Sequence, residues 1–402
     1  MPGLRHIYVH VPFCARRCSY CDFSIAVRRT IPVAPYVDAI KAELVTSSHT
    51  AGSEPVDTLY LGGGTPSRLG AAGVADLIAT IAEVHQPALM GGTEITLEAN
   101  PEDVSADAAN AWAAAGVRRV SLGVQSFDDG VLRWMHRSHD MSTVQAAMSN
   151  LRNAGIGDIS LDLIFALPDA LNRAWTADLE RALALGPDHV SLYGLTVEPH
   201  TPLGRWAARG EAMEASEDRY ANEFLEAHHR MVASGFDHYE VSNFAKPGMR
   251  SRHNSAYWRR VPYRGLGPSA HSFDGTNRRW NIPEYERWRT SVMAGRGAEA
   301  GFEALTRENR IAEEVYLGLR TVDGLELDAD ELATVEQWVE AEWAVLDGMR
   351  LALTAAGWLR LDALAAVLTA RRQVLPNPPR PDRKSTRLNS SHEWISRMPS
   401  SA

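Results

Sequence analysis

The chain has 402 residues, of which 45% are apolar and 23% are charged, the composition of a soluble globular protein of roughly two or three domains. Its formal net charge of −9 argues against nucleic acid as a partner, because proteins that bind it usually carry a basic domain or face. The first residues lead into a short strand instead of a secretory signal, and no apolar run reaches the ~18 residues of a membrane span, so we expect a cytoplasmic protein.

The cysteines of this chain lie in a short loop after the first predicted strand, which covers residues 5–12: they are Cys14, Cys18 and Cys21. Thiolates bind zinc, Cu(I) or iron–sulfur clusters, and both a structural zinc site and a cuboidal [4Fe–4S] cluster normally take four protein ligands. Three cysteines would leave one iron of such a cluster open to water or to a chelating cofactor. The alternatives are a zinc site completed by His6 or His10, and a disulfide with a spare thiol, against which the odd number of cysteines speaks.

Strand and helix patterns alternate from this loop to about residue 234. Predicted strands cover residues 5–12, 56–62, 94–98, 159–165 and 188–198, and the segment 119–127 holds another that ends before Gln125. Predicted helices cover residues 33–47, 71–84, 105–115, 128–135, 143–154, 174–185 and 216–234. Six strand–helix repeats, with polar or glycine residues directly after the strands, predict an α/β fold. We expect an open, partial (β/α)6 barrel whose site lies at the carboxyl ends of the strands.

The second and third predicted strands end in residues that suit a ligand. Residues 62–66 read GGGTP, and the third strand ends at Glu98. Consecutive glycines let the backbone approach a ligand closely and expose N–H groups. A carboxylate at a strand end can accept hydrogen bonds from a ribose or an ammonium group. On spacing alone, a plain glycine turn and a surface glutamate are adequate explanations.

Asp162 interrupts the apolar pattern of residues 159–165, which reads as a central parallel strand buried on both faces. An ionised carboxylate there is costly unless it is paired or hydrogen-bonded. A bound ligand and a structural ion pair with Arg137 are both consistent with the sequence. Gln125 likewise stands just past a predicted strand.

Together these segments resemble the oxygen-independent coproporphyrinogen III dehydrogenase-like family of the radical S-adenosylmethionine (SAM) superfamily, over about residues 4–370. The similar segments read YVHVPFC, CSYCDF, GGGTPSRL, LEANPE, GVQSF and DLIFALP, with Arg137 twelve residues after Gln125. The resemblance implies that Cys14, Cys18 and Cys21 hold a [4Fe–4S] cluster and that SAM occupies its open iron. An electron from the cluster then cleaves SAM to methionine and a 5′-deoxyadenosyl radical.

The same resemblance implies which residues contact the cofactors. The residues that match the family's SAM-contacting positions are Tyr8, Gly63, Gly64, Thr65, Glu98, Gln125, Arg137 and Asp162, and Tyr20 matches an aromatic residue next to the cluster. Tyr8 and Tyr20 have an equally good alternative as packing residues around the cysteine loop.

Two features separate the subgroups of this family. Dehydrogenases typically carry a further cysteine two residues after the third, where this chain has Phe23. Residues 253–258, HNSAYW, resemble the HNxxYW motif of the heme chaperone subgroup. Histidine is a common ligand of heme iron, and the two aromatic residues offer flat surface, so His253 is the leading candidate for a heme contact. The alternative is a surface or loop histidine, and His271, in a turn-rich segment, is a weaker candidate.

We expect a radical SAM partial barrel in residues 1–235, a barrel extension with the HNxxYW segment in residues 236–305, and a small, mostly helical C-terminal domain in residues 306–375. Helices of this last domain are predicted at residues 307–318, 329–348 and 359–369. Residues 376–402 lack apolar periodicity and resemble translated sequencing-adapter sequence, so we expect a disordered, non-native tail.

The sequence therefore predicts a heme chaperone that binds a [4Fe–4S] cluster, SAM and heme and passes heme to an acceptor protein, which could lie at the membrane. An electron donor would be a further partner. No residue is given a catalytic role, and whether the protein is an enzyme stays open. The alternative function is a dehydrogenase that converts coproporphyrinogen III to protoporphyrinogen IX by radical decarboxylation. A zinc-binding interaction protein is a third hypothesis.

Overall fold

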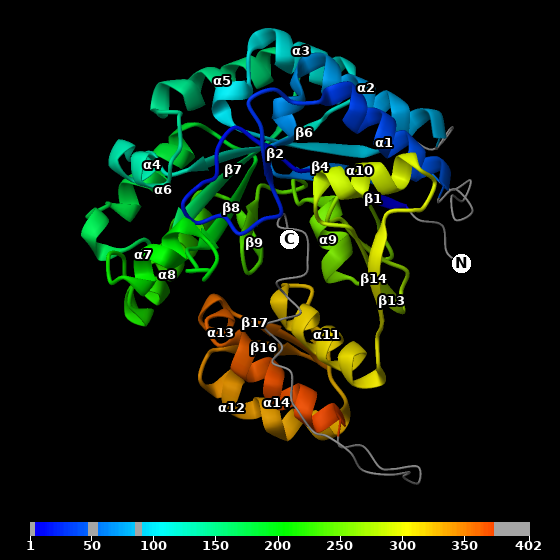
Figure 1. Cartoon of the computed structure of the whole chain (residues 1–402). Helices are drawn as coiled ribbons and strands as arrows, with labels where there is room; N and C mark the ends of the chain where they lie inside the picture. The colour runs from blue at the N-terminus through cyan, green and yellow to red at the C-terminus, as the bar shows by residue number, and fades with distance from the viewer. Residues whose placement is uncertain (1–4, 47–54, 85–90, 374–402) are drawn as a thin grey trace.

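A nine-stranded sheet forms the body of the protein (Figure 1). This computed structural model describes residues 5–46, 55–84 and 91–373. In the order of their pairing, the strands are β11 (Arg264–Leu266), β1 (His6–Val11), β4 (Thr58–Gly63), β5 (Glu94–Ala99), β6 (Arg119–Gln125), β7 (Asp158–Phe165), β8 (His189–Gly194), β10 (Asn243–Ala245) and β9 (Asp237–Glu240). Strands β11 to β8 run parallel, and β10 and β9 add an antiparallel hairpin at one edge.

Helices connect the parallel strands and cover the outer face of the sheet in an arc (Figure 1). They are α1 (Val33–Thr46), α2 (Gly70–Val84), α3 (Ala106–Ala114), α4 (Asp129–Trp134), α5 (Met141–Asn153), α6 (Trp175–Ala184) and α8 (Glu217–Ala233). Parallel neighbours require such crossover connections, and each helix buries an apolar stripe against the sheet. The predicted α/β fold with an open barrel of strand–helix repeats is confirmed.

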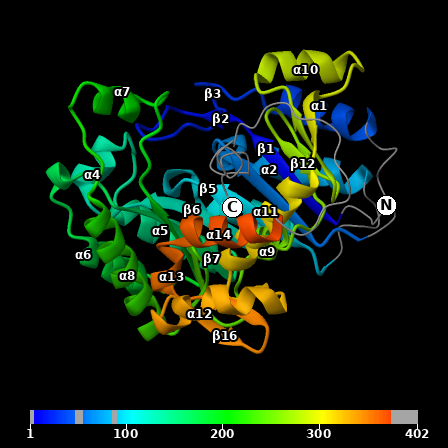
Figure 2. The same cartoon turned by 90° about the horizontal axis from the view of Figure 1, so that it is seen from below.

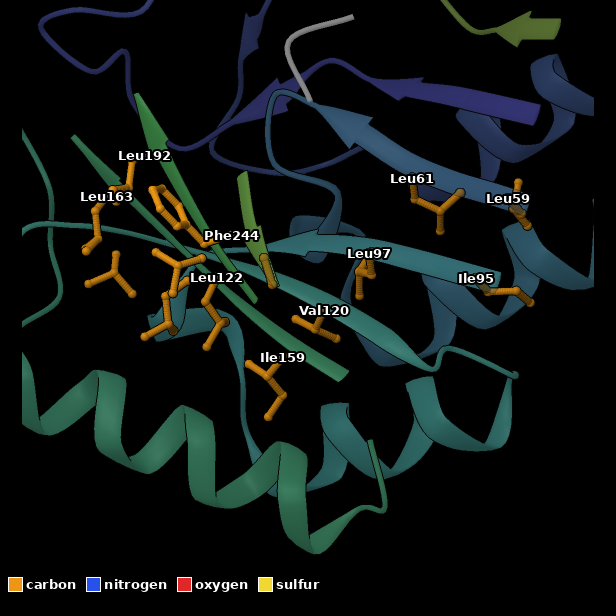
Figure 3. Close-up of a cluster of buried hydrophobic side chains, with 14 of the residues drawn as sticks. Leu59, Leu61, Ile95, Leu97, Val120, Leu122, Ile159, Leu163, Leu192 and Phe244 are labelled. Atoms are coloured by element: carbon orange, nitrogen blue, oxygen red, sulfur yellow. The ribbon is translucent and has the colours of Figure 1, made fainter. Parts of the chain in front are cut away.

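Side chains of the parallel strands alternate between an apolar outer face and a polar inner face. The outward residues form a core against the helices (Figure 3) and include Leu59, Leu61, Ile95, Leu97, Val120, Leu122, Ile159, Leu163, Leu192 and Phe244. The inward residues on the same strands include Tyr60, Glu98, Ser121, Ser160, Asp162 and Ser191. A ligand bound inside the barrel would therefore contact the polar inner face of the sheet.

The segment that follows α8 completes both edges of the sheet, since it supplies β9 and β10 at one edge and β11 at the other. Between them, α9 (Arg252–Trp258) packs against β4. Next, β12 (His271–Phe273), β13 (Asn277–Asn281) and β14 (Glu299–Ala304) form a three-stranded antiparallel sheet, and α10 (Tyr285–Met293) packs on α1.

The C-terminal domain combines helices with a small sheet. Its helices are α11 (Arg307–Arg320), α12 (Leu332–Glu340), α13 (Ala355–Trp358) and α14 (Leu361–Gln373), and its strands pair in the order β15 (Leu325–Glu326), β17 (Arg350–Leu353) and β16 (Ala344–Asp347). Figure 2 shows α11 and α14 side by side. The helix predicted at residues 329–348 is wrong beyond Glu340, because Gly348 and Met349 form a two-residue hairpin loop between β16 and β17, with Gly348 at a φ of 60°.

In the described part of the chain, no helix is both long enough and apolar enough to cross a membrane. The tail predicted to be disordered, residues 376–402, lies outside the described residues.

Shortening a core side chain tests how much of the stability comes from the outer face. Leu122 has no exposed surface, so Leu122→Ala should lower the free energy of unfolding by about 2–5 kcal/mol in urea denaturation. Val345 in β16 is 60% exposed, and Val345→Ala should change the same quantity by less than about 0.5 kcal/mol. Equal losses in the two variants would contradict this packing.

Candidate functional site

A cavity of about 390 Å³ lies over the inner face of the sheet at the carboxyl ends of the parallel strands. The structure brings almost all the predicted cofactor residues to its lining, namely Cys14, Cys18, Tyr20, Cys21, Gly63, Gly64, Thr65, Glu98, Gln125, Arg137 and Asp162. Tyr8 and His253 are the exceptions. Tyr8 is buried behind the glycine loop, where it packs against Tyr60, and its contact with SAM stays a prediction.

The cysteine loop is held by a parallel pair of short strands, β2 (Phe13–Cys14) and β3 (Ala26–Val27). All three cysteines are free thiols, and burial raises the pKa of Cys14 and raises the pKa of Cys21 to about 12. Metal binding must therefore displace protons from these thiols. Arg137 Nη1 lies 3.8 Å from Cys18 Sγ, so a guanidinium group stands beside the cysteines. Three cysteines with a cation beside them fit a cluster.

The zinc alternative gains no support from the histidines near this loop. His6 shares a hydrogen bond of 2.9 Å with Thr58. Both ring nitrogens of His10 are engaged, with Tyr8 at 3.1 Å and with the carbonyl of Ser24 at 2.9 Å. Among the described residues, no three His, Cys, Asp or Glu side chains are grouped so that they could hold one metal ion.

The glycines after β4 are required by close packing. A Cβ atom on Gly63 would lie 2.6 Å from the ring of His10, and one on Gly64 would lie 2.7 Å from the carbonyl group of Pro12. Gly63 also adopts a φ of 114°, which side chains rarely allow. Its N–H donates to Glu98 at 3.0 Å. The loop therefore lies against the end of β1 and braces a carboxylate of the cavity.

Two hydrogen-bond donors fix the carboxylate of Glu98 at the cavity. It accepts a hydrogen bond of 2.9 Å from the hydroxyl of Tyr60 as well as the one from the Gly63 N–H. Burial raises its pKa to about 7, and the nearby Asp162 adds to this shift. The carboxylate is thus half protonated near neutral pH, and a cationic ligand would draw it into the ionised form.

The carboxylate of Asp162 is hydrogen-bonded to a serine on the neighbouring strand. Ser121 Oγ lies 2.8 Å and 3.0 Å from its two carboxylate oxygens, and burial raises the pKa of Asp162 to about 6. Arg137 does not form the structural ion pair that was the alternative to a bound ligand, because its guanidinium donates to Asn100 at 2.7 Å and to the carbonyl of Gly123 at 2.5 Å. The cation points toward the cysteine loop, and the carboxylate faces the cavity.

Sequence reasoning missed Tyr60 and Ser121, which hold the two carboxylates. Both stand at inward positions of their strands, and Ser121 lies beside Glu98 on β5 and beside Ser160 on β7. Polar residues that recur with a period of two across neighbouring strands are the signal of a polar inner face.

A distortion of β6 aims Gln125 into the cavity. This residue has a φ of 68°, and the pairing of β6 with β7 shifts register between Gly123 and Gln125. Bulges and positive φ values at non-glycine residues concentrate at functional sites, where they redirect a side chain.

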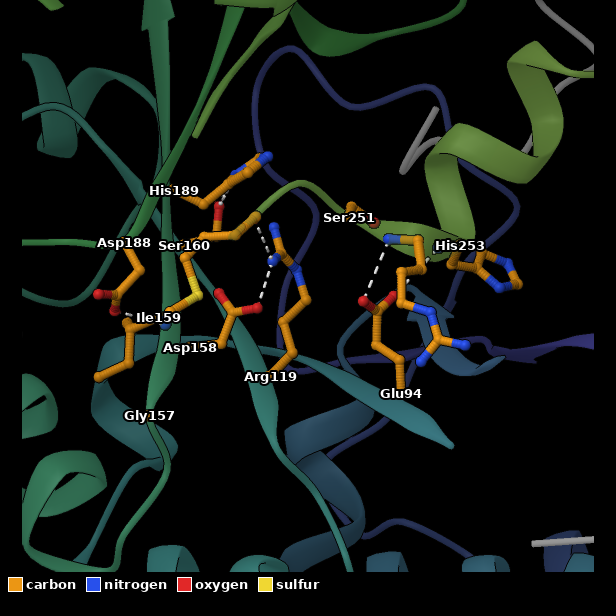
Figure 4. A network of polar contacts seen from close by, with 12 residues as sticks. Glu94, Arg119, Gly157, Asp158, Ile159, Ser160, Asp188, His189, Ser251 and His253 are labelled. Atoms are coloured by element: carbon orange, nitrogen blue, oxygen red, sulfur yellow. Dashed lines mark hydrogen bonds and ion pairs between the residues drawn. The ribbon is translucent and has the colours of Figure 1, made fainter. Parts of the chain in front are cut away.

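Further polar contacts tie α9 to the sheet (Figure 4). Arg119, which forms an ion pair of 2.6 Å with Asp158 on the next strand, also donates to the carbonyl of Met249 at 3.1 Å, just before α9. Glu94, at the start of β5, accepts the backbone N–H groups of Arg252 at 3.1 Å and His253 at 3.0 Å. A carboxylate at a helix amino terminus pairs with N–H groups that have no partner within the helix. These contacts fix the HNxxYW segment against the barrel.

His253 lies in the core of the protein, with no exposed surface. Its Nδ1 shares a hydrogen bond of 2.6 Å with Thr58, its Nε2 shares one of 2.8 Å with Tyr257, and burial holds its pKa well below the usual range. Its ring lies 5.0 Å, between centroids, from that of Tyr60, which holds Glu98. The heme contact at His253 stays a prediction, and it would require the side chain to leave this position.

The weaker candidate, His271, lies in β12 on the antiparallel sheet. Its ring stacks against that of Trp280, with 6.1 Å between centroids. It is absent from the residues that line the cavity with the cysteines.

Comparisons with known proteins agree with this geometry. Residues 8–182 match the radical SAM superfamily. The chain is 34% identical to the heme chaperone HemW of Bacillus subtilis, over 80% of this chain and 85% of that protein, and 35% identical to the heme chaperone HemW of Mycobacterium tuberculosis, over 92% and 96%. The solved coproporphyrinogen III oxidase HemN of Escherichia coli superposes with a TM-score of 0.78 at 24% identity, over 92% of this chain and 91% of that one, a likeness of fold.

The pKa values of Glu98 and Asp162 predict how SAM affinity depends on pH. Ionised carboxylates attract the cationic cofactor, so affinity should rise roughly tenfold as the pH rises through the values of about 6 and about 7. Calorimetric titration of the cluster-loaded protein with SAM at a series of pH values measures this. Glu98→Gln should remove most of the rise.

Glu102 provides the matched control, since it lines the same cavity. Although burial acts to raise its pKa, hydrogen bonds with His139 and Ser138 lower it to about 2, so this carboxylate stays ionised throughout the range. Glu102→Gln should keep the pH dependence. The same slope in Glu98→Gln as in the unchanged protein would exclude Glu98 as the titrating group.

Proposed function

The chain belongs to the heme chaperone HemW family within the radical SAM superfamily, and on this basis we propose that it binds heme and transfers it to an acceptor protein. The observation that carries the proposal is the similarity to curated heme chaperones over nearly their whole length, up to 96% for the relative from Mycobacterium tuberculosis. Phe23 adds to it, because the dehydrogenase subgroup typically has a cysteine there. Phe23 lies at the cavity and is 41% exposed.

Membership of the radical SAM superfamily implies a [4Fe–4S] cluster and SAM. Cys14, Cys18 and Cys21 would hold the cluster, which together with SAM supplies one-electron and radical chemistry when both are bound. Arg137 places a positive charge beside the Cys18 thiolate. Glu98 and Asp162 offer acceptors on the opposite wall of the cavity, each fixed by a neighbouring hydroxyl.

Two protein partners belong to the proposal. A heme acceptor takes up the cargo and could lie at the membrane, and an electron donor reduces the cluster. The cysteine loop suits contact with a donor, because Cys18 and Cys21 are only half-buried and Phe23 and Val27 expose apolar surface beside them.

The second candidate function is the radical decarboxylation of coproporphyrinogen III. The observation in its favour is the fold shared with coproporphyrinogen III oxidase over 92% of this chain. The cysteine loop and the cavity are compatible with both functions, so the reaction product has to decide between them.

Titration with hemin tests the chaperone function. The cluster-loaded protein should show a saturable shift of the Soret band, and the heme-loaded protein should pass heme to an apo-heme protein added in excess. Absorption spectroscopy follows both steps. A protein that leaves the hemin spectrum unchanged is no heme chaperone.

An anaerobic assay with SAM, a reductant and coproporphyrinogen III tests the alternative on the same preparation. The chaperone proposal predicts that chromatography finds no vinyl-bearing product. Turnover to protoporphyrinogen IX would assign the dehydrogenase function instead.

A further inference from the structure

We propose that the heme cargo binds in a second cavity, between α9 and the C-terminal domain, with its two propionate groups held by Arg250, Arg259 and Arg350. This cavity has a volume of about 560 Å³ and lies where the barrel meets the C-terminal domain, a common place for ligand sites. The inference rests on the proposed chaperone function, and it names the site and the chemistry that recognises the cargo.

The first cavity already has two groups to hold, the cluster and SAM. Its volume of about 390 Å³ is near the lower end of the ~300–1,000 Å³ that one cofactor-sized ligand occupies. The cluster and SAM both have to lie there, because the cysteines and the SAM-contacting residues line it. Heme therefore needs a separate site.

The short helix α9 separates the two cavities. Ser251 and Asn254 line the first cavity, whereas Ser255 and Trp258 line the second. His253 lies in the core beside β4, as described above. The HNxxYW segment thus contributes a tryptophan to the proposed heme site and a histidine to the wall behind SAM.

Three guanidinium groups meet at the turn between α11 and β15. Arg259 contacts the Asp323 carboxylate at 3.0 Å, and Arg250 contacts the same carboxylate at 3.7 Å. Arg350 donates to the backbone carbonyl of Asp323 at 3.0 Å and contacts Glu326 at 2.8 Å. The lining also includes Arg260, and its arginines outnumber its carboxylates, which are Glu314, Asp323 and Glu326, so a dicarboxylate can compete for the guanidinium groups.

These arginines can exchange their partners at little cost. Their side chains are 39%, 63% and 54% exposed for Arg250, Arg259 and Arg350, and exposed ion pairs contribute only ~0–1 kcal/mol each. Arg250 also approaches Asp237, at 3.7 Å, which leaves it shared between two carboxylates. Propionate groups can therefore replace the Asp323 contacts with bidentate ones.

Aromatic and apolar side chains line the rest of the cavity, and a porphyrin ring would contact the small part of each that is exposed, such as 7% of Trp258. Trp258 and Tyr239 line it together with Leu317 and Leu325. The guanidinium of Arg320 stacks on Trp258 at 4.2 Å from the ring centroid and holds that ring in place.

The lining residues of this cavity include no His, Cys or Met. Heme bound there would be held by its propionate groups and by packing, without a bond from these residues to its iron. An iron without a protein ligand is free to accept one from the next protein, which suits a cargo that must be released.

Charge reversal at the turn tests the site. Hemin titrations of the cluster-loaded protein should give an affinity about tenfold or more lower for the double variant Arg259→Glu, Arg350→Glu, because like charges then face the propionate groups. Arg259→Lys with Arg350→Lys keeps the positive charges but loses the bidentate geometry, so its affinity should lie between those of the unchanged protein and the double reversal. The matched control is Arg279→Glu, since Arg279 is similarly exposed and paired with Glu299 at 2.9 Å, but lies on β13 away from the cavity. It should bind hemin like the unchanged protein.

Two further readouts separate this site from the alternatives. Hemin dimethyl ester lacks the negative charges, so the charge reversal should not weaken its binding, and saturating SAM should leave hemin affinity unchanged. SAM affinity and the unfolding midpoint of each variant show that it is folded. His253→Ala should leave the Soret maximum of bound heme in place.

The outcomes are distinguishable from those of the chaperone function itself. If the unchanged protein binds hemin and the double reversal binds it equally well, the second cavity is not the site, although the chaperone function stands. Competition between SAM and hemin, or a Soret maximum that moves in His253→Ala, would likewise overturn the site. If the unchanged protein binds no hemin, both proposals fail.

Discussion

The rest of the site depends on two buried carboxylates that the parallel sheet keeps on its inner face. Glu98 and Asp162 would be costly to bury without donors, and hydroxyl groups of Tyr60 and Ser121 supply them. Because successive side chains of a strand alternate in direction, the same strands pack leucine, isoleucine and valine against the helices. One sheet therefore provides both the stability of the barrel and an acceptor-rich wall, opposite a cysteine loop with Arg137 beside it.

The HNxxYW segment connects this wall with the C-terminal domain. His253 lies against Tyr60, which holds Glu98, while Trp258 on the same short helix reaches the second cavity. The backbone of α9 is anchored by Glu94 at the start of β5.

Much of the fold follows from local patterns. Alternating strands and amphipathic helices predicted the barrel. The positions of Glu98 and Gln125 at strand ends, and of Asp162 within an apolar strand, predicted part of the lining of its cavity. Contacts between segments that are distant in the chain could not be predicted from the sequence. Asp162 is hydrogen-bonded to Ser121 and not to Arg137, because the pairing of neighbouring strands decides which side chains lie next to it. The predicted helix beyond Glu340 is a hairpin, because a two-residue loop joins two strands there despite the helical periodicity of the sequence. The burial of His253 likewise depends on Thr58, nearly two hundred residues away in sequence.

The proposal that Cys14, Cys18 and Cys21 would hold a [4Fe–4S] cluster beside SAM can be measured directly. Iron and sulfide analysis of the anaerobically reconstituted protein, followed by electron paramagnetic resonance of its reduced form with and without SAM, tests it most directly. The account predicts about four irons and four sulfides per chain and a spectrum that changes when SAM is added. A protein that takes up zinc in place of iron and sulfide, or a cluster whose spectrum SAM leaves unchanged, would contradict it.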